Sequence, residues 1–130
     1  MELIRSQHIP VLSNSGIESR QLLFPENSRS TRITMTRVTV PPGASNPPHR
    51  HPSSEQVWVA LRGRGTLLFD HGVSEPFAAG DVVRFEDNEL HGFENTGESE
   101  FEYISVTSPP VNFRNAYAND WSRSPKMPAP

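Results

Sequence analysis

Residues 43–63 read GASNPPHRHPSSEQVWVALRG, and this stretch carries the strongest indication of the architecture. Its second half, residues 56–61, is a mostly apolar run of strand length that ends shortly before Gly63. Its first half places His49 and His51 two residues apart, with prolines on both sides. Because residues i and i+2 of a strand share a face, both imidazoles can point toward one site.

Short strand-like runs separated by turn residues continue on both sides of this stretch. They recur at the spacing that is typical of a β sandwich or barrel. Thirteen prolines and eight glycines disfavour long helices. The sequence therefore predicts an all-β fold, with strands at Thr31–Val40, Gln56–Leu61, Thr66–Phe69, Ser74–Phe77, Val82–Phe85, His91–Glu94 and Glu100–Thr107.

The ends of the chain differ from its middle. Residues 1–30 form an expected N-terminal arm with an extra strand around Leu22–Phe24, and residues 31–121 form the β domain. After Thr107–Pro110 we expect a strand that leaves the sheet and packs against its outside, where it covers an edge or exchanges with a partner chain. Residues 122–130 carry too little apolar area to offset the entropy of ordering, so we expect a disordered tail.

Composition excludes several classes of function. The formal net charge is −3 and no basic face stands out, which argues against a nucleic-acid partner. No apolar run approaches the ~18 residues of a membrane span, so we expect no membrane partner and a cytoplasmic location. The chain has no cysteine, which excludes thiolate metal ligands and thiol nucleophiles.

A second motif, GDVVRFEDNELHGFEN at residues 80–95, adds a third histidine at position 91. With Gly43, His49 and His51, this pair of motifs resembles the cupin superfamily, whose second motif has the form G-x5-P-x-G-x2-H-x3-N. Glu86 and Asn88 stand at the Pro and Gly positions of that pattern. Asn88 can still adopt the left-handed conformation that glycine would supply. The resemblance implies a double-stranded β-helix, or jelly roll, with one metal ion inside one end of the barrel.

His49, His51 and His91 are the metal ligands that this resemblance implies. The fourth position is ambiguous, because one motif spacing selects Gln56 and the other selects Glu55. We favour Gln56, which would leave Glu55 beside the site as a supporting group or a base. Neutral imidazoles suit Zn or Fe first, with Mn or Ni as further candidates. A neutral Gln ligand would leave the full +2 charge on the metal and make it a stronger Lewis acid.

The favoured function is a metal-dependent enzyme that acts on a small oxygenated substrate, a carbonyl or enol compound that can be aromatic. The expected chemistry is redox-neutral isomerisation, cyclisation or lyase chemistry, since three-His-one-Gln centres resemble those of zinc-containing polyketide cyclases. Tyr103 is a candidate proton shuttle, whereas core packing is the simpler interpretation of the aromatic residues on the strands. Two alternatives stay open: an Fe(II)-dependent dioxygenase, and a module that binds a metal or small ligand without catalysis.

The resemblance also implies a homodimer. If Gln56 points inward, Val57, Val59 and Leu61 form an apolar outer face that would be buried by a partner.

Overall fold

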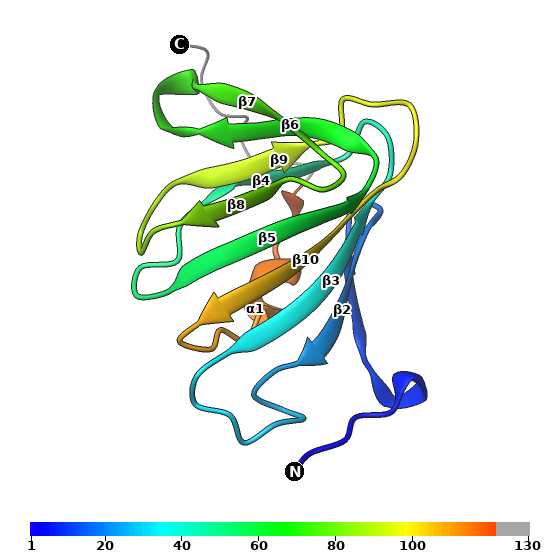
Figure 1. Ribbon diagram of the computed structural model, residues 1–130, viewed down its shortest axis with the longest axis vertical. Coiled ribbons are helices and arrows are strands. Elements are labelled where there is room, and N and C mark those ends of the chain that lie inside the picture. Colours follow the sequence, from blue (N-terminus) through cyan, green and yellow to red (C-terminus); the bar gives the residue numbers. More distant parts are fainter. Residues whose placement is uncertain (122–130) are drawn as a thin grey trace.

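The computed structural model describes residues 1–121, so the expected tail at residues 122–130 lies outside the described residues. Two antiparallel sheets face each other and enclose the core (Figure 1). The six-stranded sheet has the order β1-β2-β3-β10-β5-β8, with β1 Val11–Asn14, β2 Ile17–Leu23, β3 Thr34–Val40, β10 Phe101–Ser108, β5 Glu55–Arg62 and β8 Val82–Phe85. The four-stranded sheet has the order β4-β9-β6-β7, with β4 Ser45–His49, β9 His91–Glu94, β6 Arg64–Phe69 and β7 Ser74–Ala78.

This arrangement is a double-stranded β-helix, which confirms the predicted all-β fold class. Within residues 1–121, three short helical segments complete it: η1 Ser6–His8, η2 Asp70–Gly72 and α1 Arg114–Tyr117. None of these helices is long and apolar enough to cross a lipid bilayer.

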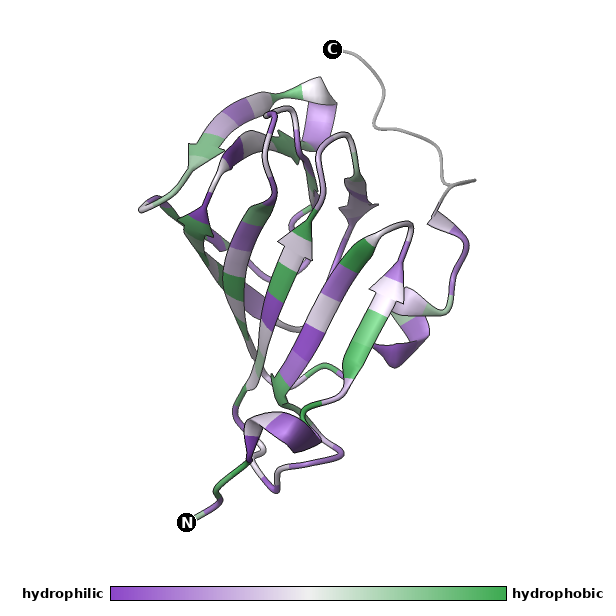
Figure 2. Ribbon diagram, turned by 90° about the vertical axis from the view of Figure 1, so that its right-hand side faces the viewer, coloured by the Kyte–Doolittle hydropathy of each residue, from purple (hydrophilic) through white to green (hydrophobic). Residues whose placement is uncertain are grey.

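Alternation along the strands determines which residues reach the core. Hydrophilic and hydrophobic residues alternate along much of the sheets (Figure 2), as expected when one face of each strand is buried. In β5, Gln56, Trp58 and Ala60 are buried, whereas Glu55 and Leu61 on the other face are exposed. The predicted core role of the strand aromatics is confirmed for Trp58, Phe85, Phe93 and Tyr103, and Phe69 packs partly buried against them.

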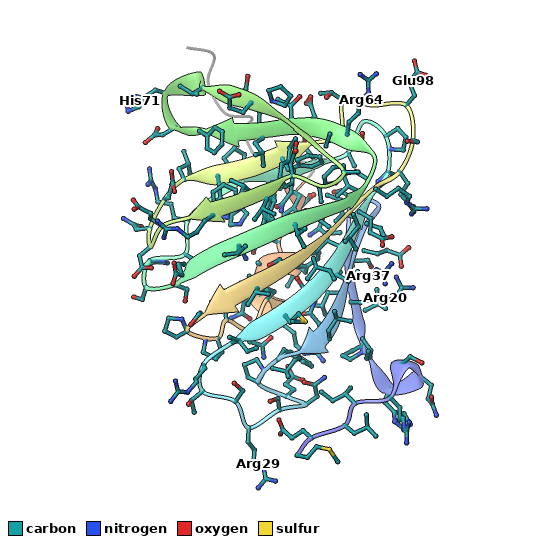
Figure 3. All side chains as sticks on the ribbon, viewed as in Figure 1. Arg20, Arg29, Arg37, Arg64, His71 and Glu98 are labelled. Atoms are coloured by element: carbon teal, nitrogen blue, oxygen red, sulfur yellow. The ribbon has the colours of Figure 1, made fainter. Side chains whose placement is uncertain are left out.

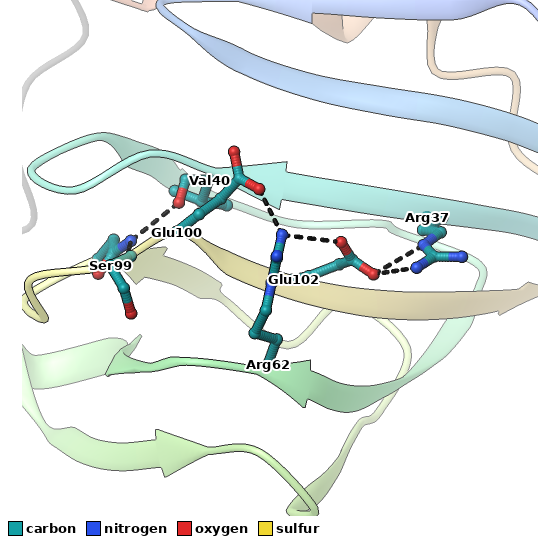
Figure 4. A network of polar contacts seen from close by, with 7 residues as sticks. Arg37, Val40, Arg62, Ser99, Glu100 and Glu102 are labelled. Atoms are coloured by element: carbon teal, nitrogen blue, oxygen red, sulfur yellow. Dashed lines mark hydrogen bonds and ion pairs between the residues drawn. The ribbon is translucent and has the colours of Figure 1, made fainter.

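The outer face of the six-stranded sheet carries a chain of ion pairs. The Arg37 guanidinium on β3 donates to Glu102 on β10, and Arg62 on β5 contacts both Glu102 and Glu100 (Figure 4). These pairs join three neighbouring strands. Arg37 interrupts an apolar run in the sequence because it belongs to this exposed network.

Three segments differ from the expectation. Residues 11–14 and 17–23 form a hairpin that extends the six-stranded sheet, where we expected one short strand around residues 22–24. Residues 45–49 form a strand, β4, despite two prolines, because β4 lies at the edge of its sheet and pairs only with β9. Residues 111–113 do not pack on the outside of the sheet, since Phe113 is buried against His51.

Candidate metal centre

The three motif histidines converge at one end of the barrel. His49 ends β4 and lies directly opposite His91, the first residue of β9, while His51 follows β4 by two residues. The ring centroids are 4.4 to 5.2 Å apart, and one ring nitrogen from each histidine lies within 4.8 Å of the others. This group can therefore hold a metal ion.

The loop before β9 fixes the histidine-bearing segment. Asn88 has φ of 63°, which confirms the predicted left-handed conformation. Its backbone N–H donates to the His51 carbonyl at 2.9 Å, and its carbonyl accepts from Arg50 at 2.8 Å. Residue 92 must be small, because a Cβ on Gly92 would lie 2.9 Å from the Asn46 carbonyl oxygen. The strands that carry His49 and His91 can therefore approach closely.

Backbone carbonyls set the tautomers of two of the histidines. His49 Nδ1 lies 2.7 Å from the Pro47 carbonyl oxygen, and His91 Nδ1 lies 2.8 Å from that of Glu89. A carbonyl oxygen can only accept, so each Nδ1 carries the proton. Each Nε2 is then left with a lone pair, the form in which imidazole binds metals.

Gln56 is oriented by two hydrogen bonds from the core. The Trp58 indole N–H donates to Gln56 Oε1 at 2.9 Å, and Gln56 Nε2 donates to Thr107 Oγ1 at 2.8 Å. Because the indole is a donor only, its partner must be the amide oxygen. This oxygen lies 3.1 Å from His91 Nε2, so two acceptors face each other.

The donor set fits a cation. Within residues 1–121, His51 Nε2 is buried and has no hydrogen-bond partner, although a buried polar atom without a partner is costly. The lone pairs of His49 and His91 and the Oε1 of Gln56 face the same site, and among the described residues only Gln56 Oε1 receives a hydrogen bond, from the Trp58 indole. A divalent transition metal would satisfy all four.

Burial keeps the three histidines neutral. Desolvation is the main cause that lowers the pKa of His51 to about 4 and that of His91 to about 3, with the neighbouring histidines adding to both shifts. Desolvation also lowers the pKa of His49, against a smaller opposing effect of the hydrogen bond to Pro47. The rings are therefore in the metal-binding form at neutral pH.

Glu55 lies on the opposite face of β5 from the histidines. Its carboxylate accepts a hydrogen bond from Arg84 at 3.0 Å, and its side chain is about half exposed. The structure thus brings Gln56, and not Glu55, to the histidine group. Arg84 points to solvent, where Glu55 and Glu86 contact its guanidinium.

A cavity of about 430 Å³ adjoins the histidines. Trp58 and Tyr103 line it from the six-stranded sheet, with their rings stacked at 4.3 Å. Burial, reinforced by the nearby Tyr117, holds the pKa of the Tyr103 phenol well above its usual value, while a hydrogen bond to Asn46 acts in the opposite direction. Tyr103 therefore lies where a bound substrate would meet a protonated phenol.

The sequence did not lead us to predict the remaining wall of the cavity. It comes from residues 111–121, which include α1 and which we name the C-terminal strap. Phe113, Tyr117 and Trp121 of the strap line the cavity. Their spacing of four residues is the signal that could have revealed an aromatic face of a helical turn. The other two histidines lie elsewhere: His8 is in η1 and His71 projects into solvent at the β6–β7 connection (Figure 3).

Comparison with known proteins identifies the fold and its relatives. The family model described as "Cupin domain" matches residues 36–107. The oxalate-binding protein of Thermotoga maritima is 32% identical over 90 residues, which cover 69% of this chain and 74% of that protein. A crystal structure described as a predicted oxalate decarboxylase from Thermotoga maritima has a TM-score of 0.71 at 28% identity, covering 82% of this chain and 98% of that one. The polyketide cyclase RemF from Streptomyces resistomycificus shares the fold, with a TM-score of 0.69 at 23% identity and coverage of 86% and 84%.

Proposed function

The chain belongs to the cupin family, and we propose that it is a metal-dependent enzyme that acts on a small carbonyl or enol compound by redox-neutral isomerase, cyclase or lyase chemistry. The observation that carries this proposal is the facing pair of acceptors, His91 Nε2 and Gln56 Oε1, at 3.1 Å. His49, His51, Gln56 and His91 would hold one divalent transition metal, with Zn or Fe preferred and Mn or Ni as further candidates.

All four proposed ligands are uncharged, and this determines the expected chemistry. A bound divalent metal would supply Lewis acidity toward a substrate oxygen, undiminished by a carboxylate ligand. Among the described residues, no Asp, Glu or Lys lines the cavity. An oxygen that becomes anionic during reaction would therefore meet no repelling carboxylate, which favours enolate-forming substrates.

The chain's own residues would orient the substrate and hold a proton. Tyr103 stays protonated because burial raises the pKa of its phenol, so it can donate a hydrogen bond to a substrate oxygen. Trp58 contributes an apolar wall and also fixes the amide of Gln56. Since Glu55 lies outside the cavity, we assign the proton-donor role to Tyr103 and propose no catalytic role for Glu55.

Proton exchange next to a carbonyl group tests this proposal. Zinc-loaded protein is incubated in D₂O with a panel of 1,3-dicarbonyl compounds, and deuterium incorporation is followed by NMR. We expect exchange above background with wild-type protein and its loss in Gln56→Leu. Oxygen uptake by the iron-loaded protein, with no exchange by the zinc form, would overturn the redox-neutral proposal in favour of the dioxygenase.

One observation favours a second candidate, the binding of a small organic acid without turnover. The relative that is 32% identical over 90 residues is described as an oxalate-binding protein. A small dicarboxylate can chelate a metal through its own oxygens and needs no further residue. Stoichiometric oxalate binding to the zinc-loaded protein, with no exchange of any dicarbonyl compound, would select this candidate.

We further propose that the protein is a homodimer through the outer face of the six-stranded sheet. Val57 and Val59 of β5 lie beside Val106 and Ile104 of β10, and all four are partly exposed. Val82 of β8, which pairs with Val59, is 65% exposed. A partner that covers this contiguous apolar surface would remove it from water.

A further inference from the structure

Hydrogen bonds hold the C-terminal strap against the rest of the chain at three places. Thr34 Oγ1 donates to the Val111 carbonyl at 3.0 Å, and the Val111 N–H donates to Thr34 Oγ1 at 3.1 Å. Asn14 Nδ2 on β1 donates to the Tyr117 carbonyl at 2.9 Å. Arg114 donates to Glu26 at the surface. These contacts hold the strap in place as one wall of the cavity. In Figure 1 the strap lies behind β5 and β10.

Aromatic rings line both the sheet side and the strap side of the cavity. The sheet contributes Trp58 and Tyr103, and the strap contributes Phe113, Tyr117 and Trp121. The Phe113 ring packs edge-on against His51, with centroids 5.6 Å apart, so the strap reaches the metal end of the cavity. A slot with aromatic walls favours a flat, conjugated occupant over a puckered, hydroxylated one.

Apart from Arg50, the described polar groups that line this cavity are neutral. The Arg50 guanidinium donates to the Asn88 carbonyl and contacts Asp70. Burial raises the pKa of Tyr117 to about 12, against a smaller opposing effect of its hydrogen bond with Ser19, so this phenol stays protonated. A substrate with a second anionic group, such as a phosphate, would meet one cation among the described lining residues, Arg50, whose guanidinium is already engaged by the Asn88 carbonyl and Asp70.

The Tyr117 phenol lies at the end of the cavity away from the histidines. The Ser19 side chain on β2 hydrogen-bonds to the Tyr117 phenol. In the six-stranded sheet, Ser19 pairs with Val38 of β3, which in turn pairs with Tyr103 of β10. Gln56 pairs with Thr107 of β10. Thr107 is four residues beyond Tyr103, so these two backbone positions are about 13 Å apart along the strand. An occupant that spans the cavity can therefore have one oxygen at the histidines and another at the Tyr117 phenol.

Resting on the proposed function, we infer that the substrate is a planar aromatic or enolic ring system with one ionised oxygen, and that Tyr117 of the strap donates a hydrogen bond to a second oxygen, remote from the metal. The strap thereby selects the substrate. Tyr117 is a binding and positioning residue that the sequence motifs do not include.

Two catechols test this inference by difference absorbance. The probe is 4-nitrocatechol, a flat ring whose catecholate end can bind the metal and whose nitro oxygens extend to the other end. Unsubstituted catechol is the matched ligand without the remote oxygens. We expect Tyr117→Phe to weaken binding of 4-nitrocatechol to the zinc-loaded protein by about fivefold, the size of one hydrogen bond, and to change catechol binding by less than about twofold. His71→Asn, at an exposed position, is the control and should change neither.

The outcomes separate this inference from the metal proposal. A chain that fails to retain zinc contradicts the proposed function itself. Retained zinc with no binding of either catechol overturns the inference about a planar substrate. Equal weakening of both probes by Tyr117→Phe, or no weakening of either, overturns the role of Tyr117, since a merely structural effect would not distinguish the two ligands. Circular dichroism of Tyr117→Phe verifies that the variant is folded.

Discussion

Gln56 Oε1 lies 3.1 Å from His91 Nε2, and neither atom carries a hydrogen to share. The Trp58 indole fixes the amide oxygen on this side, and the Glu89 carbonyl fixes the proton of His91 on the far nitrogen. Two facing lone pairs in a buried site are unfavourable unless a cation lies near both. This contact connects the sequence motifs to a metal-binding role for Gln56.

The two candidates for the fourth ligand should behave differently when truncated. Gln56→Ala removes one of the four converging acceptors, so we expect zinc affinity to fall by at least about tenfold, which corresponds to ~1.4 kcal/mol. Glu55→Ala removes only a half-exposed ion pair with Arg84 and should change the affinity by less than about threefold. Competition with a chromogenic chelator measures both. Equal losses, or a larger loss for Glu55→Ala, would contradict the assignment.

Trp58 should matter to the metal through the hydrogen bond it donates. Trp58→Phe keeps an aromatic ring in the core but frees the Gln56 amide to rotate, so we expect zinc affinity to fall about tenfold. Trp121→Phe, at the strap wall of the same cavity, is the matched control and should leave zinc affinity unchanged. If Trp58→Phe binds zinc as tightly as the wild type, the indole does not orient the ligand.

The metal-free protein should lose stability as the pH falls below about 6.5. Burial puts the folded-state pKa of His51 at about 4 and that of His91 at about 3, below the ordinary value of 6.5. Between these values the unfolded chain binds more protons than the folded one, so the free energy of unfolding rises with pH. The stability contributed by the neutral rings is complete above pH 6.5 and is lost toward pH 4 to 3.

Melting temperatures in the presence of a chelator, at pH 7.5 and pH 5, measure this effect. His51→Asn should show a smaller decrease between the two pH values than the wild type, because one buried titrating ring is gone. His71→Asn, at an exposed position, should show the wild-type decrease. A His51→Asn decrease as large as that of the wild type would contradict the explanation.

Asn88 should tolerate glycine but not a β-branched residue. Its φ of 63° is accessible to Gly and Asn, whereas Val there meets a steric penalty of about 1–2 kcal/mol. We therefore expect Asn88→Val to lower the free energy of unfolding by roughly that amount, and Asn88→Gly to change it by less than about 0.5 kcal/mol. Chemical denaturation measures both variants. Similar losses in the two variants would show that the Asn side chain, and not the backbone conformation, is required.

The sequence was most informative where a local rule determines geometry. The apolar run that ends before Gly63 predicted a strand where β5 lies, and the left-handed preference of asparagine predicted the conformation of Asn88. The sequence could not distinguish Glu55 from Gln56, because both faces of that strand carry apolar residues and only the tertiary packing determines which face is buried in the core. Nor did it locate the strap, whose position depends on long-range bonds from Thr34 and Asn14.

Metal content is the most direct test of the central claim. Untagged protein is incubated with Zn²⁺, Fe²⁺, Mn²⁺ or Ni²⁺, separated from free metal by gel filtration and analysed for elements per chain, beside a His91→Ala variant. We predict about one divalent transition metal per wild-type chain and a large loss in His91→Ala, because a removed imidazole takes one of the four converging acceptors away. Wild-type protein that stays free of every one of these metals, or a His91→Ala variant that retains a full equivalent, would contradict the account.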